Sequence, residues 1–298
     1  MEQLKQLLTA AGIAYKENEP LAAHCTFKIG GPARLFVQPA DRAQLCRAVA
    51  LCKAQSVRCY LLGNGSNILF ADEGYNGAVL DISSMQDAVE VHGSQLTAGA
   101  GVRLSALCKT ALEHGLTGLE FAYGIPGTVG GAVYMNAGAY GGEMKDVLTT
   151  VQYLTAEGEV KEAAAAELDL RYRHSIFEEN GGCILSAQFT LTPGEPEAIR
   201  AKMDELMAKR LDKQPLDKPS AGSTFKRPAG AFAAALIDQC GLRGYRHGGA
   251  AVSEKHCGFV VNLGGATCAD VLALCEEVRA IVKEKTGYDL EKEIRVVR

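Results

Sequence analysis

The sequence has no Trp, no C-x-x-C pair, no long uncharged apolar run and no large excess of one charge. The absence of Trp excludes no function. No apolar run approaches the roughly 18 residues that a membrane-spanning helix needs, so we expect no transmembrane segment. The net charge of −4 argues against general nucleic-acid binding, because contacts with a phosphate backbone need Lys and Arg gathered on one face. Membrane and nucleic-acid partners are therefore not expected.

The ten cysteines show no Cys/His spacing typical of a metal site. We expect them to be reduced and mostly buried, and we expect no metal. Residues 1–15 predict a short amphipathic helix without the basic start and long apolar core of a signal peptide, which favours the cytoplasm. A chain of 298 residues with 47% hydrophobic residues is long enough for two or three compact units.

Glycine is concentrated in two segments. Residues 118–142 hold eight glycines and few charged side chains, and residues 63–67 (GNGSN) form a second such element between apolar stretches. Glycine permits positive φ and lets backbone N–H groups point at an anion. Two such cradles predict a ligand with two phosphates.

Apolar periodicity and Gly/Pro punctuation predict alternating helices and strands. Besides the N-terminal helix, we expect helices over 41–55, 104–114, 195–211, 231–240 and 268–285. We expect strands over 26–37 with a Gly-Gly-Pro bend, 57–62 (buried), 68–70, 78–82, 89–91, 95–98, 147–154, 183–191 and 294–297. No G-x-G-x-x-G motif opens a helix after a strand, so a Rossmann unit is not favoured.

Seven segments, taken in order, resemble one family over essentially the whole chain. They are HCTFKIGGPA (24–33), LLGNGSNIL (61–69), GIPGTVGGAVYMNAGAYG (124–141), YRHSIF (172–177), PSAGSTFKRP (219–228), GGAAVSEKHCGFVVN (248–262) and LEKEIRVV (290–297). The family is UDP-N-acetylenolpyruvoylglucosamine reductase, a flavoenzyme family of bacterial peptidoglycan-precursor synthesis.

This resemblance implies an α+β fold. It implies a two-subdomain FAD-binding region of the type found in vanillyl-alcohol oxidase and p-cresol methylhydroxylase, followed by an α+β substrate-binding domain. We place the first FAD-binding subdomain at 1–72, joined by the C-terminal strand at 288–298. The second subdomain is placed at 73–205 and the substrate-binding domain at 206–287.

The implied reaction has two halves. NADPH reduces FAD, and hydride from the flavin N5 then reaches the enolpyruvyl ether of UDP-N-acetylglucosamine enolpyruvate, giving UDP-N-acetylmuramate. His24 invites comparison with the covalent flavin link of some proteins of this fold, but the resemblance implies noncovalent FAD. The expected partner is this small-molecule substrate, with a monomer as the working expectation.

Three residues match the family's catalytic positions. Hydride addition leaves negative charge next to the substrate carboxylate, and a guanidinium suits such an enolate because it is permanently charged and binds planar oxygens. The resemblance gives Arg173 this role and makes Ser223 the proton donor to carbon. Alternation along a strand would place Glu291, Glu293 and Arg295 on one face, so two carboxylates are candidates from the pattern alone. The resemblance selects Glu293 as the polarising or proton-relaying partner.

The remaining site residues are expected to bind cofactor or substrate. The FAD-binding candidates are Ile29, Gly30, Gly31, Gly63, Asn64, Gly65, Ser66, Asn67, Tyr123, Gly124, Ile125, Pro126, Gly127, Gly130, Gly131, Asn136, Gly138 and Ala139. The candidates for the UDP moiety are Lys213, Lys226, Arg227, Ser253, Lys255, His256 and Asn262. For His256 a binding or structural role is preferred over acid–base catalysis.

Two departures from the family pattern stand out. Many members carry Asn where this chain has Arg227, so a charged contact replaces an amide. Longer relatives carry an extra segment with a substrate-covering tyrosine, for which the stretch between Arg173 and Ser223 leaves no room; the chain therefore resembles the shorter subclass.

Two alternatives stay open at this point. One is an FAD-dependent oxidase on the same scaffold, which would have no reason to carry Arg173, Ser223 and Glu293 together. The other is a flavin-binding protein without catalysis, which would be expected to have lost one of the three.

Overall fold

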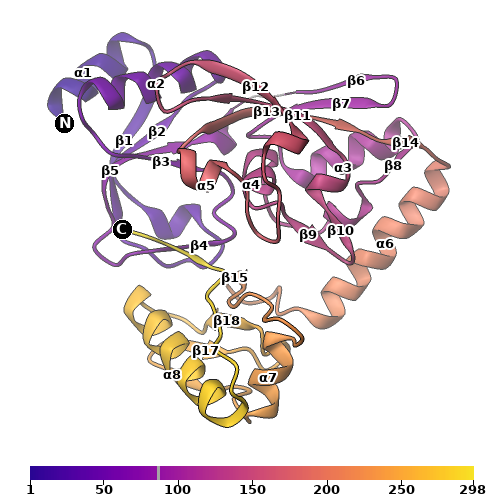
Figure 1. The fold of residues 1–298 in the computed structure, drawn as a ribbon. Helices are drawn as coiled ribbons and strands as arrows, with labels where there is room; N and C mark the ends of the chain where they lie inside the picture. Colours follow the sequence, from indigo (N-terminus) through magenta and orange to yellow (C-terminus); the bar gives the residue numbers. More distant parts are fainter. Residues whose placement is uncertain (86–87) are drawn as a thin grey trace. The chain divides into compact units, whose positions relative to one another are not determined.

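The computed structural model describes residues 1–85 and 88–298, and the chain divides into two compact units (Figure 1). The first unit consists of Met1–Lys16, Leu35–Asn64 and Gly77–Arg210. The second consists of Glu17–Arg34, Gly65–Asn76 and Leu211–Arg298. Each unit is thus assembled from three separate stretches of sequence, and the domain boundaries expected above stay a prediction.

Two sheets organise the first unit. A five-stranded antiparallel sheet has the order β12-β11-β13-β7-β6, and a four-stranded sheet has the order β1-β2-β5-β3. Of the latter, β3 lies wholly in the first unit, and the other three strands have some residues assigned to the second. The first sheet comprises β6 (Val89–His92), β7 (Gln95–Gly99), β11 (Leu148–Leu154), β12 (Val160–Ala164) and β13 (Cys183–Thr190). The second comprises β1 (Ala14–Pro20), β2 (Pro32–Gln38), β3 (Cys59–Leu62) and β5 (Tyr75–Asp81). Short pairs are formed by β8 (Leu116–Thr117) with β14 (Thr192–Pro193) and by β9 (Gly138–Ala139) with β10 (Gly142–Glu143).

The helices of this unit are α1 (Glu2–Ala10), α2 (Arg42–Ala54), α3 (Leu104–Glu113), α4 (Val129–Tyr134), α5 (Phe177–Asn180) and most of α6 (Pro196–Lys213). The start of α2 is fixed by Asp41, whose carboxylate accepts the N–H of Gln44. A continuous hydrophobic core joins both sheets to the helices, with Leu35, Leu80, Leu96 and Leu107 fully buried. This core carries the glycine-rich segments described below.

The second unit pairs a small sheet with two helices. Its antiparallel sheet has the order β15-β18-β17-β16, formed by β15 (Ser220–Ser223), β16 (Arg246–His247), β17 (Ala250–Val252) and β18 (Phe259–Asn262). The helices are α7 (Ala233–Gln239) and α8 (Cys268–Thr286). Separately, β19 (Arg295–Val297) pairs in parallel with β4 (Ile68–Phe70). The carboxylate of Asp72 accepts the N–H groups of Cys268 and Ala269, so the turn after β4 also caps α8.

Five of the six predicted helices are confirmed to within two residues, whereas the N-terminal helix ends at Ala10, five residues before its predicted limit, and β1 begins at Ala14. Two strand predictions are wrong in part. Residues 26–31 are not a strand, because the N–H of Gly31 bonds Ala71 and its carbonyl accepts from Leu21. The final strand, predicted at 294–297, is β19 and begins at Arg295, so residues 290–294 do not form the strand whose alternation was considered for the two glutamates. The strand β3 is only partly buried, because it lies at an edge of its sheet.

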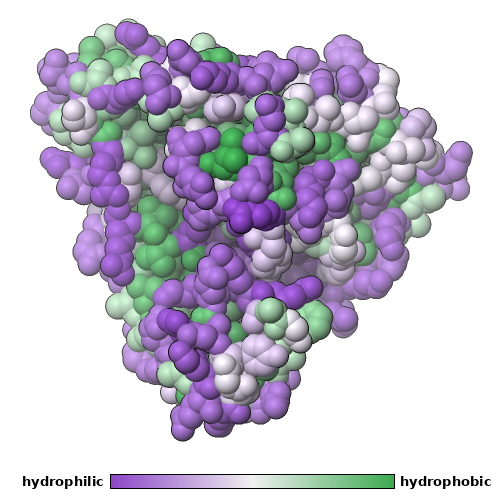
Figure 2. All heavy atoms as spheres, viewed as in Figure 1, coloured by the Kyte–Doolittle hydropathy of each residue, from purple (hydrophilic) through white to green (hydrophobic). Residues whose placement is uncertain are grey.

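Polar side chains dominate the visible surface of both units in the space-filling view (Figure 2). This agrees with the burial of the apolar residues in the cores. Across residues 1–85 and 88–298, none of the helices combines the length and the apolar character that crossing a bilayer requires.

Candidate functional site

The first glycine-rich turn follows β3, and its first two residues belong to the first unit. A Cβ on Gly63 would lie 2.4 Å from the Oγ1 of Thr128, so only glycine fits there. The side-chain amide of Asn64 donates to the carbonyl of Pro126 over 2.9 Å. These contacts join the turn at 63–64 to the second glycine-rich segment within one unit, as the two-cradle prediction requires.

The rest of the turn, residues 65–67, belongs to the second unit. Gly65 has φ +60°, and a Cβ there would lie 2.4 Å from the carbonyl oxygen of His24. Its own carbonyl accepts the N–H of Thr26 over 3.1 Å. Within the described chain, the backbone N–H groups of Asn64, Gly65 and Ser66 donate to no protein acceptor. Three consecutive free N–H groups suit an anion such as a pyrophosphate.

Ile29, Gly30 and Gly31 pack beside β4 and the turn that follows it. Ile29 is buried, and a Cβ on Gly30 would lie 2.5 Å from the Cβ of Phe70. A Cβ on Gly31 would lie 2.1 Å from the carbonyl oxygen of Asp72. These glycines are explained by close packing of protein against protein in the second unit, whether or not a ligand also lies against them.

The second glycine-rich segment contains the short helix α4. The N–H of Gly130 donates to the carbonyl of Ala100, and a Cβ on Gly130 would lie 2.9 Å from that residue's Cβ. The neighbouring Gly131 is exposed, and a Cβ there would meet only the Oγ1 of Thr128, at 3.6 Å. This side of α4 is therefore the open side, where a ligand can approach the backbone.

Asn136, one of the FAD-binding candidates, makes several hydrogen bonds to the protein. It is fully buried, and its amide donates to Glu143 over 2.6 Å and to the carbonyl of Arg171 over 3.0 Å. Its carbonyl oxygen accepts the N–H of Lys145. Since both N–H groups of this amide donate to protein and its oxygen accepts from Lys145, Asn136 organises the loop that carries Gly138 and Ala139.

Arg210, a residue that the sequence analysis did not single out, lies beside the second segment. Its Cδ would be 2.9 Å from a Cβ on Gly124, and its Nε is buried without a hydrogen-bond partner among the described residues. Burial lowers the pKa of its guanidinium. A guanidinium with one buried, unpartnered N–H beside a glycine-rich cradle suits a negatively charged cofactor. Its place near the end of α6, just before the KQP sequence, was the only sequence signal available.

Arg173 lies in a tight turn of the first unit. One guanidinium nitrogen, Nη2, donates to the carbonyl of Gly138 over 3.3 Å, and the group stacks 4.9 Å from the ring centroid of Tyr172. Arg173 is half-buried, with φ +57°. The structure thus brings the predicted enolate-binding cation to the predicted cofactor loop.

Ser223 and Glu293 lie on neighbouring backbone segments of the second unit. Ser223 ends β15 opposite Phe259, after a bulge at Gly222 with φ +73°. The next residue, Thr224, accepts the N–H of Glu293 at its carbonyl over 2.8 Å. The side-chain amide of Asn67 also donates to the carbonyl of Glu293 over 3.3 Å. Glu293 is therefore bonded to the residue that follows Ser223 and to the side chain of Asn67, a predicted phosphate-turn residue.

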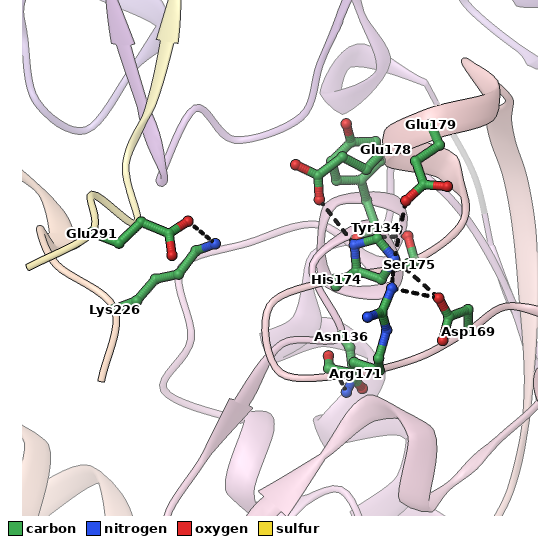
Figure 3. Close-up of polar contacts among 10 residues, drawn as sticks. All are labelled: Tyr134, Asn136, Asp169, Arg171, His174, Ser175, Glu178, Glu179, Lys226 and Glu291. Atoms are coloured by element: carbon green, nitrogen blue, oxygen red, sulfur yellow. Dashed lines mark hydrogen bonds and ion pairs between the residues drawn. The ribbon is translucent and has the colours of Figure 1, made fainter. Parts of the chain in front are cut away.

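Several predicted substrate contacts follow β15. Lys226 pairs with Glu291 over 2.5 Å (Figure 3), and its N–H donates to the carbonyl of the same residue. The guanidinium of Arg227 stacks 4.6 Å from the ring centroid of the exposed Phe232. Both cations are accessible enough to meet an anionic ligand.

The loop between β17 and β18 holds three more of them. The Oγ of Ser253 accepts the N–H groups of Lys255 and His256, and Lys255 donates to the carbonyl of Leu211. The ring of His256 accepts the N–H of Gly258 at Nδ1 and packs edge-on against Phe259. Burial lowers the pKa of His256, which favours the neutral ring and a structural role.

The last two candidates lie apart from that loop. Asn262 is buried, donates to the carbonyl of Phe27 and accepts two backbone N–H groups, so its amide is satisfied by protein. Lys213 is the last residue of α6 and is exposed.

Comparison with known proteins gives the family. A family model described as UDP-N-acetylenolpyruvoylglucosamine reductase, C-terminal domain, matches residues 214–297, and one described as FAD binding domain matches residues 33–164. The UDP-N-acetylenolpyruvoylglucosamine reductase of Agathobacter rectalis is 49% identical over 308 residues, which cover 99% of this chain and 96% of that protein. The chain belongs to the UDP-N-acetylenolpyruvoylglucosamine reductase family.

Further comparisons agree with this assignment. The reductase of Caldanaerobacter subterraneus is 46% identical, with 100% of this chain and 97% of that protein covered. The crystal structure of the reductase MurB from Thermus caldophilus has a TM-score of 0.80 at 34% identity, with 96% of this chain and 99% of that chain covered. The α+β fold, with an FAD-binding domain followed by the reductase C-terminal domain, is confirmed.

The glycine-rich residues of the first unit fall inside the FAD-binding match, whereas Ser223 and Glu293 fall inside the reductase C-terminal match. The residues present fit FAD. Among the described residues of the first unit, the N–H of Asn64 and the Nε of Arg210 are free donors, and the side of α4 at Gly131 is open to a ligand. Among those of the second unit, the N–H groups of Gly65 and Ser66 are free donors of the kind that a pyrophosphate calls for.

Proposed function

We propose that this reductase converts UDP-N-acetylglucosamine enolpyruvate to UDP-N-acetylmuramate with FAD and NADPH, in the cytoplasm, for peptidoglycan precursor synthesis. Full-length similarity to reductases supports the reaction. The observation that supports the residue roles is the backbone pairing of residues 224–226, which directly follow Ser223, with residues 291–293. The substrate is a small-molecule UDP-sugar, and a monomer is sufficient for the reaction proposed.

The cofactor would be held without a covalent link by the two glycine-rich segments. We assign its pyrophosphate to the free N–H groups at residues 64–66 and its further contacts to residues 29–31, 123–131 and 138–139. When bound, FAD takes hydride from NADPH and supplies it to the enolpyruvyl double bond. The task left to the protein is to bind the substrate, stabilise the charge that hydride addition creates and deliver one proton to carbon.

Ser223 is proposed to deliver that proton. Its Oγ–H donates to the carbon that carries the enolate charge, and a carbanionic enolate is basic enough to take a proton from a well-placed hydroxyl. Glu293, held beside it through the carbonyl of Thr224, polarises the enol or relays the proton to Ser223. The fixed backbone of both segments keeps the two groups together between turnovers.

Arg173 is proposed to bind the carboxylate oxygens of the enolpyruvyl group. Its planar guanidinium offers paired donors to planar oxygens, and its charge is worth most when the enolate forms. For the UDP moiety we propose Lys213, Lys226, Arg227 and Lys255, with Ser253, His256 and Asn262 shaping the loops. Arg227 stands where an amide is usual in the family and would add a charge toward the diphosphate.

The first experiment is an anaerobic two-step titration of the holoenzyme. NADPH is added and the flavin absorbance is followed, and UDP-N-acetylglucosamine enolpyruvate is then added before any oxygen. We expect bleaching, then rapid recovery with formation of UDP-N-acetylmuramate. Recovery only on admitting oxygen would instead identify an oxidase, and bleaching without recovery under either condition would identify a flavin-binding protein without this chemistry.

A matched serine pair tests the proton donor. Ser223→Ala should leave flavin reduction by NADPH unchanged and slow reoxidation by substrate about 10²- to 10⁴-fold, the usual range for loss of a general acid. Ser220→Ala makes the same change in the same strand and should leave both steps near wild type. Equal loss in both variants would show that the strand, rather than the Ser223 hydroxyl, is responsible.

A matched carboxylate pair separates the two glutamates of the 290–295 segment. Glu293→Gln should slow reoxidation of the flavin by substrate, whereas Glu291→Gln, which removes only the exposed pair with Lys226, should not. The reverse result would move the catalytic carboxylate to Glu291.

A further inference from the structure

The turn that carries Arg173 holds its backbone in an unfavourable conformation. Arg171 and His174 exchange backbone hydrogen bonds, with N–H to carbonyl distances of 3.3 and 3.1 Å, and Tyr172 and Arg173 form the tip. Arg173 has φ +57°, a left-handed conformation that costs a residue with a Cβ about 1–2 kcal/mol. Glycine would adopt this φ without strain, but it has no guanidinium. The turn must therefore be stabilised by neighbouring groups.

His174 lies among charged side chains on both sides of the turn (Figure 3). Its Nε2 is 2.9 Å from Arg171 Nη2 and 3.3 Å from Asp169 Oδ2, and its Nδ1 is 3.3 Å from Glu178 Oε2. Glu179 contributes a third carboxylate, 3.8 Å from Nε2. Only 16% of the His174 side chain is exposed. The ring therefore connects the segment before Arg173 to the helix α5 after it.

Donor and acceptor roles define what the ring does. A guanidinium has only donors, so the short contact with Arg171 needs the lone pair of Nε2, and the proton then lies on Nδ1, which donates to Glu178. Arg171 in turn pairs with Asp169 over 2.6 Å. A side-chain chain thus runs from Asp169 through Arg171 and His174 to Glu178, across the base of the turn.

The two flanks of the turn are fixed independently. The buried amide of Asn136 donates to the carbonyl of Arg171, and the fully buried Ser175 donates to the carbonyl of Tyr134 over 2.7 Å. Both contacts attach the turn to the glycine-rich segment. Neither spans the turn itself, which leaves the ring of His174 as a cross-link from side chain to side chain.

We propose that His174 is a positioning residue for Arg173. By accepting from Arg171 and donating to Glu178, its ring keeps the strained turn closed, so that the Arg173 guanidinium stays at the carbonyl of Gly138. The inference rests on the proposed role of Arg173 at the enolate. A misplacement of about 1 Å at such a group can lower a rate about 10²-fold.

Two substitutions test this with a matched control. His174→Phe keeps a ring but loses both nitrogens, and it should slow reoxidation of the flavin by substrate about tenfold or more while NADPH reduces the flavin at the wild-type rate. His174→Gln retains an acceptor that can reach Arg171 and should recover most of that loss. His92→Phe makes the same change at an exposed histidine of β6 and should alter neither step.

A double-mutant cycle decides whether His174 acts through Arg173. Combined with Arg173→Lys, His174→Phe should add little further loss, because the group that it positions has already been replaced. Fully additive effects, equal slowing of both half-reactions, or no slowing in His174→Phe would each overturn the proposal. An Arg173→Lys variant as fast as wild type would instead overturn the role proposed for Arg173.

Discussion

Two turns present the proposed catalytic residues, and they place the strained backbone conformation differently. In the first unit the positive φ falls on Arg173 itself, whereas in the second unit it falls on Gly222, one residue before Ser223. A Cβ on Gly222 would meet nothing within 4 Å, so this glycine serves only its own backbone. Where the residue with positive φ also carries the proposed functional side chain, glycine cannot replace it. Neighbouring groups must then stabilise the strained backbone.

The supports differ accordingly. The Arg173 turn is closed by the backbone pair between Arg171 and His174, and it depends in addition on the side chains of Asn136, His174 and Ser175. The Ser223 segment is held mainly by backbone: Thr224 donates to the carbonyl of Gly258 and accepts from Glu293. A turn that depends on side chains can be disturbed by one side-chain substitution, but a segment held by backbone resists most substitutions except proline.

Arg173→Gly should have the largest effect on activity of the substitutions in the two turns. Reoxidation of the flavin by substrate should fall about 10²- to 10³-fold, the usual loss when a charge-stabilising group is removed. The free energy of unfolding should stay within about 1 kcal/mol of wild type, because glycine relieves the left-handed strain while adding freedom to the unfolded chain. Stopped-flow absorbance and denaturant unfolding measure the two quantities, and a loss of several kcal/mol would contradict the assigned strain.

Lys226→Pro tests the segment held by backbone. Proline removes the N–H that donates to Glu291, and the free energy of unfolding should fall by about 3 kcal/mol. Lys226→Ala removes only the exposed side-chain pair and should cost about 0–1 kcal/mol. Similar losses in the two variants, measured by thermal unfolding, would mean that side chains hold this segment too.

Substitutions at Gly222 test the strain in the second turn, and their expected effects are smaller. Gly222→Ala should lower the free energy of unfolding by about 1–2 kcal/mol through φ alone, since nothing obstructs the Cβ. Gly222→Asn should cost less, because asparagine tolerates the left-handed region better. An alanine variant as stable as wild type would remove the need for glycine at this bulge.

The smallest expected effect is a dependence of stability on pH at His256. Burial lowers its pKa in the folded protein, so the unfolded chain binds the proton first as pH falls. Stability should therefore be fully present above about pH 6.5, the ordinary histidine pKa, and should decline below it. His256→Gln should flatten this decline in unfolding curves at pH 7.5 and 5.0, and an unchanged slope would assign it to other groups.

Local sequence signals located the helices and most strands, because apolar spacing reports which face of a segment is buried. They failed at 26–31, and the alternation considered for 290–295 does not hold, because the hydrogen-bond partners of both segments lie far away in sequence. Residues 291–293 pair with 224–226 and the chain then turns to Asn67 and β4, so no continuous alternation develops. A segment that changes its hydrogen-bond partner in this way shows no regular alternation of apolar and polar residues in the sequence.

The site was predictable to the extent that motifs mark it. The motif around Arg173 located the turn, yet His174 drew no attention, because its importance depends on three carboxylates that the fold gathers around it. The i, i+4 spacing of His174 and Glu178 was the one readable signal. Conversely, Asn136 and Asn262 matched binding motifs, but their side-chain amides donate hydrogen bonds to protein groups.

The hydrogen bond between Asn67 and Glu293 joins residues 226 positions apart, and it has a consequence for biosynthesis. At about 5–20 residues per second, a ribosome makes Glu293 roughly ten to forty-five seconds after Asn67. Throughout that interval β4 lacks its neighbour β19. The nascent second unit therefore keeps an unpaired strand, and the proposed catalytic set of Arg173, Ser223 and Glu293 is complete only at the end of translation.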